Sequence, residues 1–376
     1  MKIIFLIRQL NYAGAERQLV TLAKRLQQRG HSVSVAVFYA DGPLESELRQ
    51  SSVPVHSLDK RGRWDTLGFM WRLFKLVRRE QPDILHGYLT VSNIFTALIG
   101  TMCPGVQTAW GVRSSNMDLE NYDWLMRVSY RVERWFSRFA DLIIVNSYAG
   151  LDYAAAQGYP SEKMIVIPNG VDTERFRPDR EAGRRVRHEW RLTDEQILIG
   201  LVGRIDPMKD HATFLEAAAL LAREHPALVF ACVGRSVEPY KSKLVEISKQ
   251  LGLDDRLIWS EAREDIPDVY NALDVLVSSS CSEGFSNVVV EAMASGVPCV
   301  VTDVGDSKMI VGNCGEVVRP QDAPALKSAI ERRLDKRRAD HVEDQPSRQR
   351  IVDRFSVIEL EAKTEAALLS LCKGAA

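Results

Sequence analysis

The chain has 376 residues, of which 45% are hydrophobic and 26% are charged, and its formal net charge is −1. This length exceeds that of one typical domain and fits two domains of roughly 150 to 200 residues each, with the composition of an ordinary globular protein. The nearly neutral charge and the lack of a recognised nucleic-acid-binding module argue against nucleic-acid binding. The sequence also has no run of about 18 or more apolar residues that would predict a transmembrane helix.

The first part of the chain alternates short apolar runs with amphipathic stretches. Val, Ile and Leu dominate the runs with few polar residues between them, which is typical of parallel strands buried on both faces. The predicted strands are Lys2–Ile7, Ser32–Phe38, Val53–His56, Asp83–His86, Val106–Trp110, Leu142–Asn146 and Met164–Ile167. We therefore predict a doubly wound α/β domain over residues 1–175.

The loop after the first predicted strand, NYAGAE, leads into a helix that begins near Gly14. Backbone N–H groups and the positive end of the helix would point into the crevice at the edge of the sheet, which favours an anion such as a phosphate. The loop lacks the G-x-G-x-x-G fingerprint, so a dehydrogenase is disfavoured. A helix that follows a strand is also an ordinary feature of every such domain.

The segment from Asp123 to Phe139 is predicted to be a basic amphipathic helix. One stripe carries four arginines at intervals of four, three and four residues, namely Arg127, Arg131, Arg134 and Arg138. A second stripe carries the apolar residues Leu125, Val128, Val132, Trp135 and Phe139. Such a helix suits an anionic membrane surface or a phosphate-bearing acceptor. The alternative is a solvated charged face on a helix whose apolar side packs on the sheet.

Residues 168–178, PNGVDTERFRP, contain two prolines and a glycine and are predicted to be a hinge. The alternation then resumes with strands at Ile197–Val202, Leu228–Val233, Arg256–Trp259, Leu273–Val277, Cys299–Thr302 and Gly315–Val318. Between and after them lie the helical stretches Ala212–Glu224, Tyr240–Leu251 and Pro324–Leu334. We predict a second doubly wound domain over residues 176–354, with the cleft between the two domains as the default site.

The stretch from Cys281 to Val301 places Glu283 and Glu291 eight residues apart, across a turn and the start of a helix that we expect Asn287 to cap and Gly296 to end. Open α/β sheets bind ligands at the carboxyl ends of their strands, so both carboxylates are candidate ligand-binding groups. From spacing alone, two ordinary surface acids are an equally good interpretation.

Arg204 and Lys209 lie in the segment VGRIDPMKDH, between a predicted strand and a predicted helix, and therefore at the same edge of the second sheet. A planar guanidinium and a flexible ammonium suit a diphosphate. Two cations facing two carboxylates suggest a nucleotide sugar, with Glu291 on the ribose, Glu283 on the sugar and the cations on the departing diphosphate. Taken alone, the two cations are more simply surface residues of a loop.

Four motifs occur in order along the chain: AGAERQ, PNGVD, VGRIDPMKDH and SEGFSNVVVEAMASGVPCVVTDVG. Together they resemble the retaining nucleotide-sugar glycosyltransferases of the GT-B fold, in the large family called group 1 and numbered four. The resemblance runs from Gly14 to about Pro320, and the E-x7-E element from Glu283 to Glu291 is its most specific part. It implies two Rossmann-like domains facing a central cleft, with a C-terminal helix, residues 355–376, that crosses back onto the first domain.

The resemblance also implies residue roles. Arg204 and Lys209 would stabilise the leaving diphosphate and Glu283 would meet the transferred sugar, which makes these three the predicted catalytic residues. The predicted donor-binding set is Gly14, Gly203, Arg204, Lys209, Arg263, Glu283, Gly284, Phe285, Ser286, Asn287, Val288 and Glu291. Neither a metal nor another cofactor is implied, and the sequence has no convincing D-x-D pair or His cluster.

The acceptor side departs from the family pattern. Many relatives carry a histidine in the loop after the fifth strand, where this chain has WGVRSSN, Trp110 to Asn116. Arg113 in this loop would clamp a donor diphosphate or an acceptor phosphate, but it cannot act as a general base. His86, after the fourth strand, is a second candidate on the acceptor side, with a packed structural histidine as the alternative.

The implied activity is transfer of a hexose from a nucleotide sugar, with UDP the commoner base and GDP the next, to a saccharide or lipid-linked acceptor in cell-surface polysaccharide synthesis. Retention of configuration is implied by the family alone. A double displacement would need a carboxylate beneath the anomeric carbon, which the sequence does not place. A GT-B epimerase and a non-catalytic sugar-binding scaffold stay open as alternatives.

The predicted location is cytoplasmic. The N-terminal apolar run meets Arg8 too soon for the core of a signal peptide. The six cysteines have no C-x-x-C spacing, which predicts reduced and mostly buried thiols instead of disulfides or a zinc site. The basic helix would add peripheral contact with the inner face of the membrane.

Overall fold

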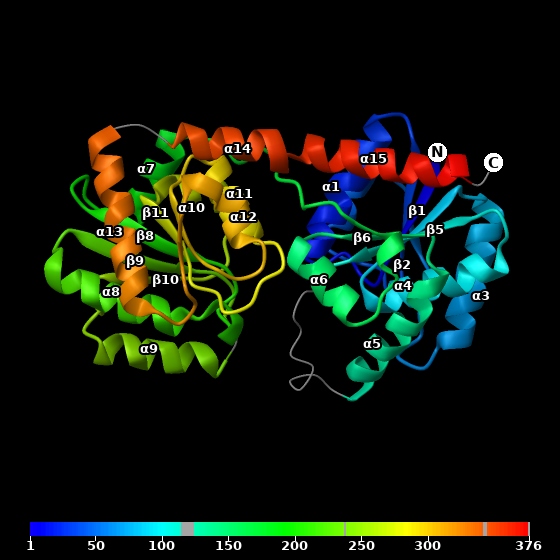
Figure 1. Cartoon of the computed structure of the whole chain (residues 1–376), viewed down its shortest axis with the longest axis horizontal. Coiled ribbons are helices and arrows are strands. Elements are labelled where there is room, and N and C mark those ends of the chain that lie inside the picture. Colours follow the sequence, from blue (N-terminus) through cyan, green and yellow to red (C-terminus); the bar gives the residue numbers. More distant parts are fainter. Residues whose placement is uncertain (114–123, 237, 341–343, 375–376) are drawn as a thin grey trace. The chain divides into compact units, whose positions relative to one another are not determined.

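The structure is a computed structural model that describes residues 1–113, 124–236, 238–340 and 344–374 (Figure 1). The chain forms two compact units. One joins Met1–Gly170 with Val357–Ala376, and the other comprises Val171–Ser356. The chain thus passes between units after residues 170 and 356, where 175 and 354 were the boundaries expected from the sequence.

Within the described residues, the first unit contains a seven-stranded parallel sheet in the order β3-β2-β1-β4-β5-β6-β7. The strands are β1 (Lys2–Ile7), β2 (Ser32–Val37), β3 (Val55–Ser57), β4 (Ile84–Tyr88), β5 (Gln107–Val112), β6 (Leu142–Val145) and β7 (Met164–Val166). The helices are α1 (Gly14–Gln28), α2 (Glu45–Gln50), α3 (Thr66–Glu80), α4 (Thr90–Met102), α5 (Trp124–Phe136), α6 (Tyr148–Ala156) and α15 (Val357–Gly374), with short 3-10 turns η2 (Ser137–Phe139) and η3 (Ser161–Lys163). In β1 the five residues Ile3 to Ile7 are fully buried, as a strand covered on both faces requires.

The second unit contains, within the described residues, a six-stranded parallel sheet in the order β10-β9-β8-β11-β12-β13. The strands are β8 (Ile197–Val202), β9 (Leu228–Val233), β10 (Leu257–Ser260), β11 (Val275–Ser278), β12 (Cys299–Thr302) and β13 (Glu316–Val318). The helices are α7 (Arg180–Glu189), α8 (His211–Glu224), α9 (Tyr240–Gln250), α10 (Ile266–Ala272), α11 (Asn287–Ala294), α12 (Ser307–Val311), α13 (Ala323–Asp340) and α14 (Gln345–Phe355), with the 3-10 turns η4 (Pro207–Lys209) and η5 (Gly312–Cys314). Every predicted strand is confirmed to within two residues at each end, and the prediction of two doubly wound Rossmann-like domains is confirmed.

The last helix, α15, packs on α1 of the first unit (Figure 1). The carboxylate of Glu361 on α15 is 1% exposed and accepts hydrogen bonds from Arg25, at 2.6 Å, and from Arg29 of α1. Glu365 lies 2.6 Å from the ring of His31. Because a buried carboxylate is tolerated when it is paired in this way, the pairs fix α15 to the first unit.

The helix after β11 begins differently from our expectation. Asn287 is its first residue instead of its cap, because Ser286 holds the cap position with an extended backbone and makes no side-chain capping hydrogen bond. The helix ends at Ala294, and Gly296 follows with a φ of 75°, the left-handed conformation that ends helices.

Two further observations complete the fold. All six cysteines are free thiols, of which three are buried, two are half-buried and Cys281 is exposed. No helix of the described residues is both long and apolar enough to cross a membrane.

The strand order reverses between β1 and β4 in the first sheet and between β8 and β11 in the second. Ligands of doubly wound sheets bind at such a reversal, outside the carboxyl ends of the strands. The loop from Gly203 to Lys209 follows β8, and the loop from Ser279 to Ser286 follows β11. Both loops that carry the predicted catalytic residues therefore flank the reversal of the second sheet.

Candidate active site

The loop after β8 is shaped by two aspartates on either side of Lys209. Asp206 caps the 3-10 turn η4 by accepting a hydrogen bond from the Lys209 backbone N–H at 3.3 Å. Asp210 has a φ of 46° and caps α8, accepting a hydrogen bond from the Thr213 backbone N–H at 3.3 Å and a second from the Thr213 hydroxyl at 2.6 Å. These caps satisfy backbone groups at the start of each turn, so the backbone that carries Lys209 has a defined direction.

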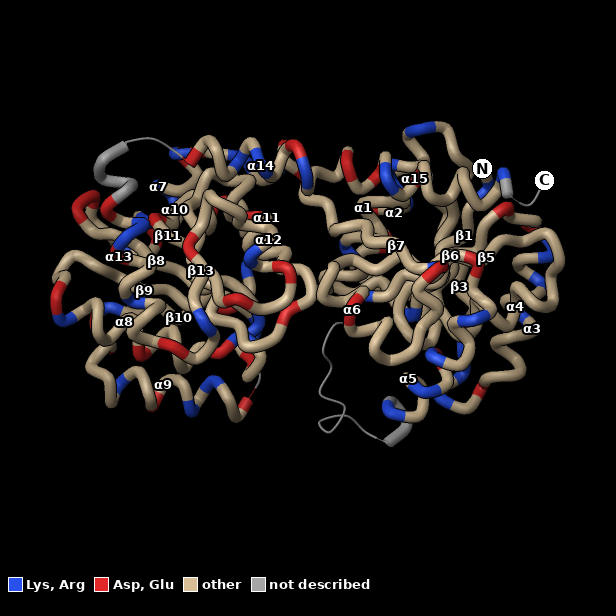
Figure 2. The backbone as a smooth tube through the Cα atoms, in the orientation of Figure 1, with Lys and Arg blue, Asp and Glu red and all other residues tan. Residues whose placement is uncertain are grey.

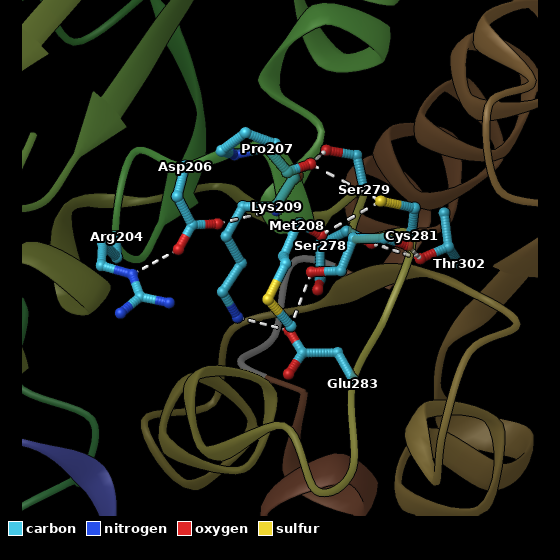
Figure 3. A network of polar contacts seen from close by, with 11 residues as sticks. Arg204, Asp206, Pro207, Met208, Lys209, Ser278, Ser279, Cys281, Glu283 and Thr302 are labelled. Carbon is cyan, nitrogen blue, oxygen red and sulfur yellow. Dashed lines mark hydrogen bonds and ion pairs between the residues drawn. The ribbon is translucent and has the colours of Figure 1, made fainter. Parts of the chain in front are cut away.

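The loop after β11 is joined to the first loop by hydrogen bonds (Figure 3). The Ser279 hydroxyl donates to the carbonyl oxygens of Lys209, at 3.0 Å, and Asp210, at 2.9 Å. The backbone N–H of Cys281 donates to the carbonyl of Met208 at 2.9 Å. The two loops therefore form one hydrogen-bonded structure.

An ion pair between Lys209 and Glu283 lies at the centre of this structure (Figure 3). Their side chains are only 20% and 13% exposed, and the Ser280 hydroxyl donates to the same carboxylate at 2.8 Å. An ammonium group has three N–H donors, so Lys209 can hold Glu283 and an anionic ligand together. The structure thus brings together two of the three predicted catalytic residues.

Arg204 lies at the outer side of the same loop. Its guanidinium pairs with Asp206, and its side chain is 62% exposed (Figure 3). Asp206 thus links the two cations, because it pairs with Arg204 and caps the turn that carries Lys209. Two positive side chains from one short loop favour a ligand with more than one negative charge.

Glu291 is held by a tyrosine that the sequence did not indicate. It lies on α11, and its carboxylate accepts a hydrogen bond from the Tyr270 hydroxyl on α10 at 2.8 Å. Tyr270 is fully buried, and burial raises its pKa well above the usual value, so the hydroxyl keeps its proton and donates. This bond fixes the direction of the Glu291 carboxylate.

A third loop, after β12, packs on the backbone beside Glu283. The N–H of Asp306 donates to the carbonyl of Gly284 at 2.9 Å. Gly305 has a φ of 53°, and a Cβ atom there would collide with the carbonyl oxygen of Glu283. A glycine is therefore required at position 305 for the loop to approach so closely.

In the predicted donor-binding turn from Gly284 to Val288, the side chains are buried or half-buried. The Phe285 ring is 7% exposed and packs against Phe355 with 5.6 Å between ring centroids. The Ser286 hydroxyl is buried and has no hydrogen-bond partner among the described residues. Asn287 and Val288 are half-buried.

Arg263 lies in a network of ion pairs, whereas Gly203 lies beside the Lys209 side chain. The Arg263 guanidinium binds both carboxylate oxygens of Glu189, at 2.5 and 2.9 Å, and also Asp265, at 2.7 and 2.8 Å. These pairs join α7 to the start of α10 and engage the donors of Arg263. Gly203 has a φ of 150°, which places it in the region that favours glycine, next to the Lys209 side chain.

Gly14 begins α1 in the first unit and is exposed. The residue before it, Ala13, offers no side chain to cap the helix. The backbone N–H groups of the first turn of α1 therefore receive no capping hydrogen bond from the side chain of residue 13. Such N–H groups suit the predicted interaction with an anion.

Arg113 is held by two residues at the carboxyl end of the first sheet. Its guanidinium donates to Asn169, at 2.8 Å, and to the Tyr88 hydroxyl, at 2.9 Å, and it lies 4.8 Å from the centroid of the Tyr88 ring. Asn169 belongs to the PNGVD segment, so this segment orients Arg113 in addition to connecting the units.

His86 is completely buried between aromatic rings. Its centroid lies 5.1 Å from that of Phe5 and 4.9 Å from that of Tyr88, and neither ring nitrogen has a hydrogen-bond partner among the described residues. Burial, together with the nearby charge of Arg113, lowers its pKa to about 3. These surroundings favour the alternative of a packed structural histidine that supports Tyr88.

The predicted basic helix corresponds to α5 and the turn η2. Arg127, Arg131, Arg134 and Arg138 are all exposed, and Figure 2 shows basic residues along this element. The second stripe is not packed on the sheet throughout, because Val128, Trp135 and Phe139 are 39%, 51% and 40% exposed. The side chain of Leu125 lies outside the described ones.

A cluster of two glutamates and one histidine near α13 has the composition of a metal site. The ligand atoms of Glu224, His225 and Glu331 lie within 4.8 Å of one another. The ammonium of Lys327 lies 2.8 and 3.0 Å from the two carboxylates. This cluster is therefore a salt-bridge network in which a lysine supplies the positive charge.

Sequence reasoning missed the residues that orient the predicted ones. Asp206 had a readable signal, since an Asp before Pro at the start of a turn is a common cap. Tyr270, Ser280, Asn169 and Tyr88 had none, because the side chains they contact are brought to them by the tertiary fold.

Two Rossmann-like domains, with paired cations and carboxylates at the strand-order reversal of the second, define the GT-B class of glycosyltransferases. Residues 12–175 match the family described as Glycosyltransferase Family 4, and residues 196–336 match Glycosyl transferases group 1. The chain belongs to this group 1 family of GT-B glycosyltransferases.

Known proteins agree with this assignment. The UDP-Gal:alpha-D-GlcNAc-diphosphoundecaprenol alpha-1,3-galactosyltransferase of Escherichia coli is 26% identical over 300 residues, which cover 76% of this chain and 75% of that protein. The lipopolysaccharide core biosynthesis mannosyltransferase LpsB of Rhizobium meliloti is 32% identical over 181 residues, 46% of this chain and 51% of that protein. The crystal structure of Anabaena Alr3699/HepE in complex with UDP has the same fold, with a TM-score of 0.86 and 23% identity over 98% of this chain and 100% of that one.

Proposed function

We propose that this glycosyltransferase moves a hexose from a UDP-sugar, with retention of configuration, to a hydroxyl of a saccharide or lipid-linked acceptor in cell-surface polysaccharide synthesis. The observation that carries the proposal is the Lys209–Glu283 ion pair at the strand-order reversal of the second sheet, with Glu291 on the helix that follows. The UDP donor and the acceptor class are supported by the names of the galactosyltransferase relative and of the HepE complex with UDP.

In the proposed reaction, Lys209 and Arg204 bind the diphosphate and stabilise the negative charge that grows as the bond from the anomeric carbon to the phosphate oxygen breaks. The leaving diphosphate takes the electron pair of that bond. The acceptor oxygen bonds to the anomeric carbon on the face from which the diphosphate departs, and its proton passes to a phosphate oxygen. No protein nucleophile and no metal ion enter this scheme.

Glu291 is proposed to hold the ribose and Glu283 the sugar hydroxyls. Glu291 is suited to two vicinal hydroxyls because Tyr270 fixes its direction. Glu283 shares its charge with Lys209, so binding of the diphosphate to Lys209 and of the sugar to Glu283 are coupled through one ion pair. Backbone N–H groups between Gly284 and Val288 and at Gly14 would add uncharged donors, and Gly203 and Arg263 complete the proposed donor site as shaping residues.

On the acceptor side we propose Arg113 as the group that binds a phosphate of the acceptor, with His86 acting through Tyr88. Arg113 is half-buried and already directed by Asn169 and Tyr88. A guanidinium held in one direction binds phosphate with less loss of side-chain entropy than a free one.

We also propose that the enzyme works in the cytoplasm at the inner face of the membrane, with α5 on the lipid surface. Four exposed arginines and the exposed Trp135 on one helix favour anionic headgroups. Reversal of all four charges should weaken sedimentation with anionic vesicles at low salt, and unchanged sedimentation would contradict this contact.

The donor is tested with a panel of UDP-, GDP- and ADP-sugars. A bound ligand raises the midpoint of thermal unfolding, and we expect the UDP-sugars to raise it most. The one that binds is then incubated with and without acceptor, with and without a chelator, and the product is examined by NMR. Acceptor-dependent formation of an α-linkage from an α-linked donor supports the proposal; interconversion of the donor without acceptor would indicate the epimerase instead.

A further inference from the structure

The outer face of α3 exposes three large apolar side chains. Trp64, just before the helix, is 78% exposed, Leu67 is 85% exposed and Trp71 is 57% exposed. Leu67 and Trp71 are four residues apart and lie on one side of the helix, and Trp64 lies in the turn that leads into it. The opposite side packs in the core through the buried residues Phe69, Leu73, Leu76 and Val77. The core face of α3 is thus complete without the exposed residues.

This face is also basic. Residues 60–80 contain seven Lys and Arg and two Asp and Glu. Both acids are paired, Asp65 with Arg72 and Glu80 with Lys2 and Arg79. Figure 2 shows basic residues near α3.

The apolar and basic parts of the face form one stripe along the helix. Four residues after Trp71, Lys75 lies with its ammonium 3.8 Å from the centroid of the Trp71 ring. Arg78 follows at the next helical position of the same side, and both Lys75 and Arg78 are exposed. The sequence from Trp64 to Arg78 therefore presents aromatic and aliphatic groups first and cations next.

We propose that this α3 face, formed by Trp64, Leu67, Trp71, Lys75 and Arg78, docks on the surface of an anionic lipid bilayer. Tryptophan is favoured at the headgroup level, where its ring is partly apolar and its N–H stays hydrated, and neighbouring cations bind lipid phosphates. The pairing of both acids leaves a positive face, which complements an anionic surface. Lipid binding needs neither donor nor acceptor, so the inference goes beyond the proposed transfer reaction.

This surface differs from the one on α5 in how it should bind. The four arginines of α5 act through charge, which salt screens within about 3 Å at 1 M ionic strength. The apolar residues of α3 leave water on binding, and that contribution persists in salt. The apolar residues of the α3 face are more exposed than Val128, Trp135 and Phe139 of the α5 surface, so the α3 face is expected to supply the larger salt-resistant part of membrane binding.

The test is sedimentation of the full chain with vesicles of phosphatidylglycerol and phosphatidylcholine, at low salt and at 1 M salt. Trp64→Ser/Leu67→Ser/Trp71→Ser should lower the partition coefficient at least about tenfold and remove most of the binding at high salt. The matched control Ile358→Ser changes an apolar residue on α15 that is 55% exposed and should bind as wild type. Lys75→Glu/Arg78→Glu should weaken binding at low salt only.

The proposal would be overturned if the wild-type protein did not bind these vesicles, or if the triple variant bound them like wild type at high salt. It would also be overturned if light scattering showed that the wild type is a dimer and the triple variant a monomer, because the face would then be an interface between copies of the chain. The single variant Trp71→Ser repeats the test with the smallest change to the fold. Sugar transfer to a water-soluble acceptor should be unchanged in the triple variant, so loss of vesicle binding and failure of the proposed transfer reaction remain distinguishable.

Discussion

The two units place their candidate groups in opposite ways. In the second unit the groups lie on short loops that are hydrogen-bonded to one another, with Lys209 and Glu283 in contact across 74 residues of sequence. In the first unit His86 is buried in the core, and Arg113 is directed by Tyr88 and Asn169. The comparison teaches that the proposed donor groups are held by loops that hydrogen-bond to one another, whereas the proposed acceptor groups depend on how a few side chains are oriented.

The largest effect should come from the proposed donor groups of the second unit. Lys209→Ala removes the ammonium that we propose to stabilise the leaving diphosphate, and we expect kcat to fall by about 10²- to 10³-fold. Initial rates with saturating donor measure this change. The matched control is Lys243→Ala, an exposed lysine of α9 in the same unit, which should retain full activity. Equal rates for the two variants would contradict the role of Lys209.

A second change tests the acceptor side. Arg113→Ala removes a guanidinium that is proposed to bind an acceptor phosphate, and we expect the acceptor KM to rise by about 10- to 100-fold while the donor KM stays constant. Arg49→Ala, an exposed arginine of the same unit, is the control. A rise in the donor KM alone would move Arg113 to the donor diphosphate and remove the contrast between the units.

A third prediction concerns pH. Burial lowers the pKa of His86 to about 3 and that of His211 to about 4, so both are neutral in the folded protein. Histidine in the unfolded chain has a pKa of about 6.5, so below that pH the unfolded chain binds more protons than the folded protein. As the pH is lowered from about 6 to 4, the free energy of unfolding therefore falls by roughly 1.4 kcal/mol per pH unit for each histidine. Above about pH 7 neither histidine contributes to the pH dependence of the free energy of unfolding, because both are neutral in the folded and the unfolded protein.

Urea denaturation at pH 7.5, 6 and 5 measures this slope. His86→Phe should reduce it to about half, because phenylalanine cannot be protonated and can pack against Phe5 and Tyr88, while His211 still contributes. His188→Asn, an exposed histidine of α7, should leave the slope as in wild type. A wild-type slope in His86→Phe would show that this ring is not buried in its neutral form.

The smallest effect should come from Tyr270→Phe. It removes one hydrogen bond to Glu291 and is expected to raise the donor KM by about 2- to 10-fold with kcat unchanged. In a Glu291→Ala background the same change should have no effect on the donor KM, because the group that Tyr270 directs is gone. An additive effect in the double variant would assign Tyr270 a merely structural role.

The strands were predictable because their signal is local. Apolar runs of Val, Ile and Leu between turn residues mark buried parallel strands, and the runs from Lys2 to Ile7 and from Leu228 to Val233 are β1 and β9. The strand–loop–helix order also placed Lys209 and Glu283 at one sheet edge. The cap of α11 was wrong because Ser286 and Asn287 are both good capping residues and the sequence does not say at which one the backbone turns.

Side-chain partners were beyond the sequence. Tyr270 and Glu291 are 21 residues apart and Arg113 and Asn169 are 56 apart, and each pair meets only after the sheets have formed. The exposure of Trp71 and Trp135 was equally hidden, because an amphipathic pattern gives the faces of a helix but not which apolar residues the neighbouring helices fail to cover.

The central claim is that the second unit binds the donor through Glu291 and the Lys209–Glu283 pair. It is tested most directly by calorimetric titration of UDP, or of the nucleoside diphosphate that gives the largest thermal shift, into wild type, Glu291→Ala and Lys243→Ala. We expect wild type and Lys243→Ala to bind alike and Glu291→Ala to bind at least about tenfold more weakly. Equal affinity of all three proteins would contradict the account.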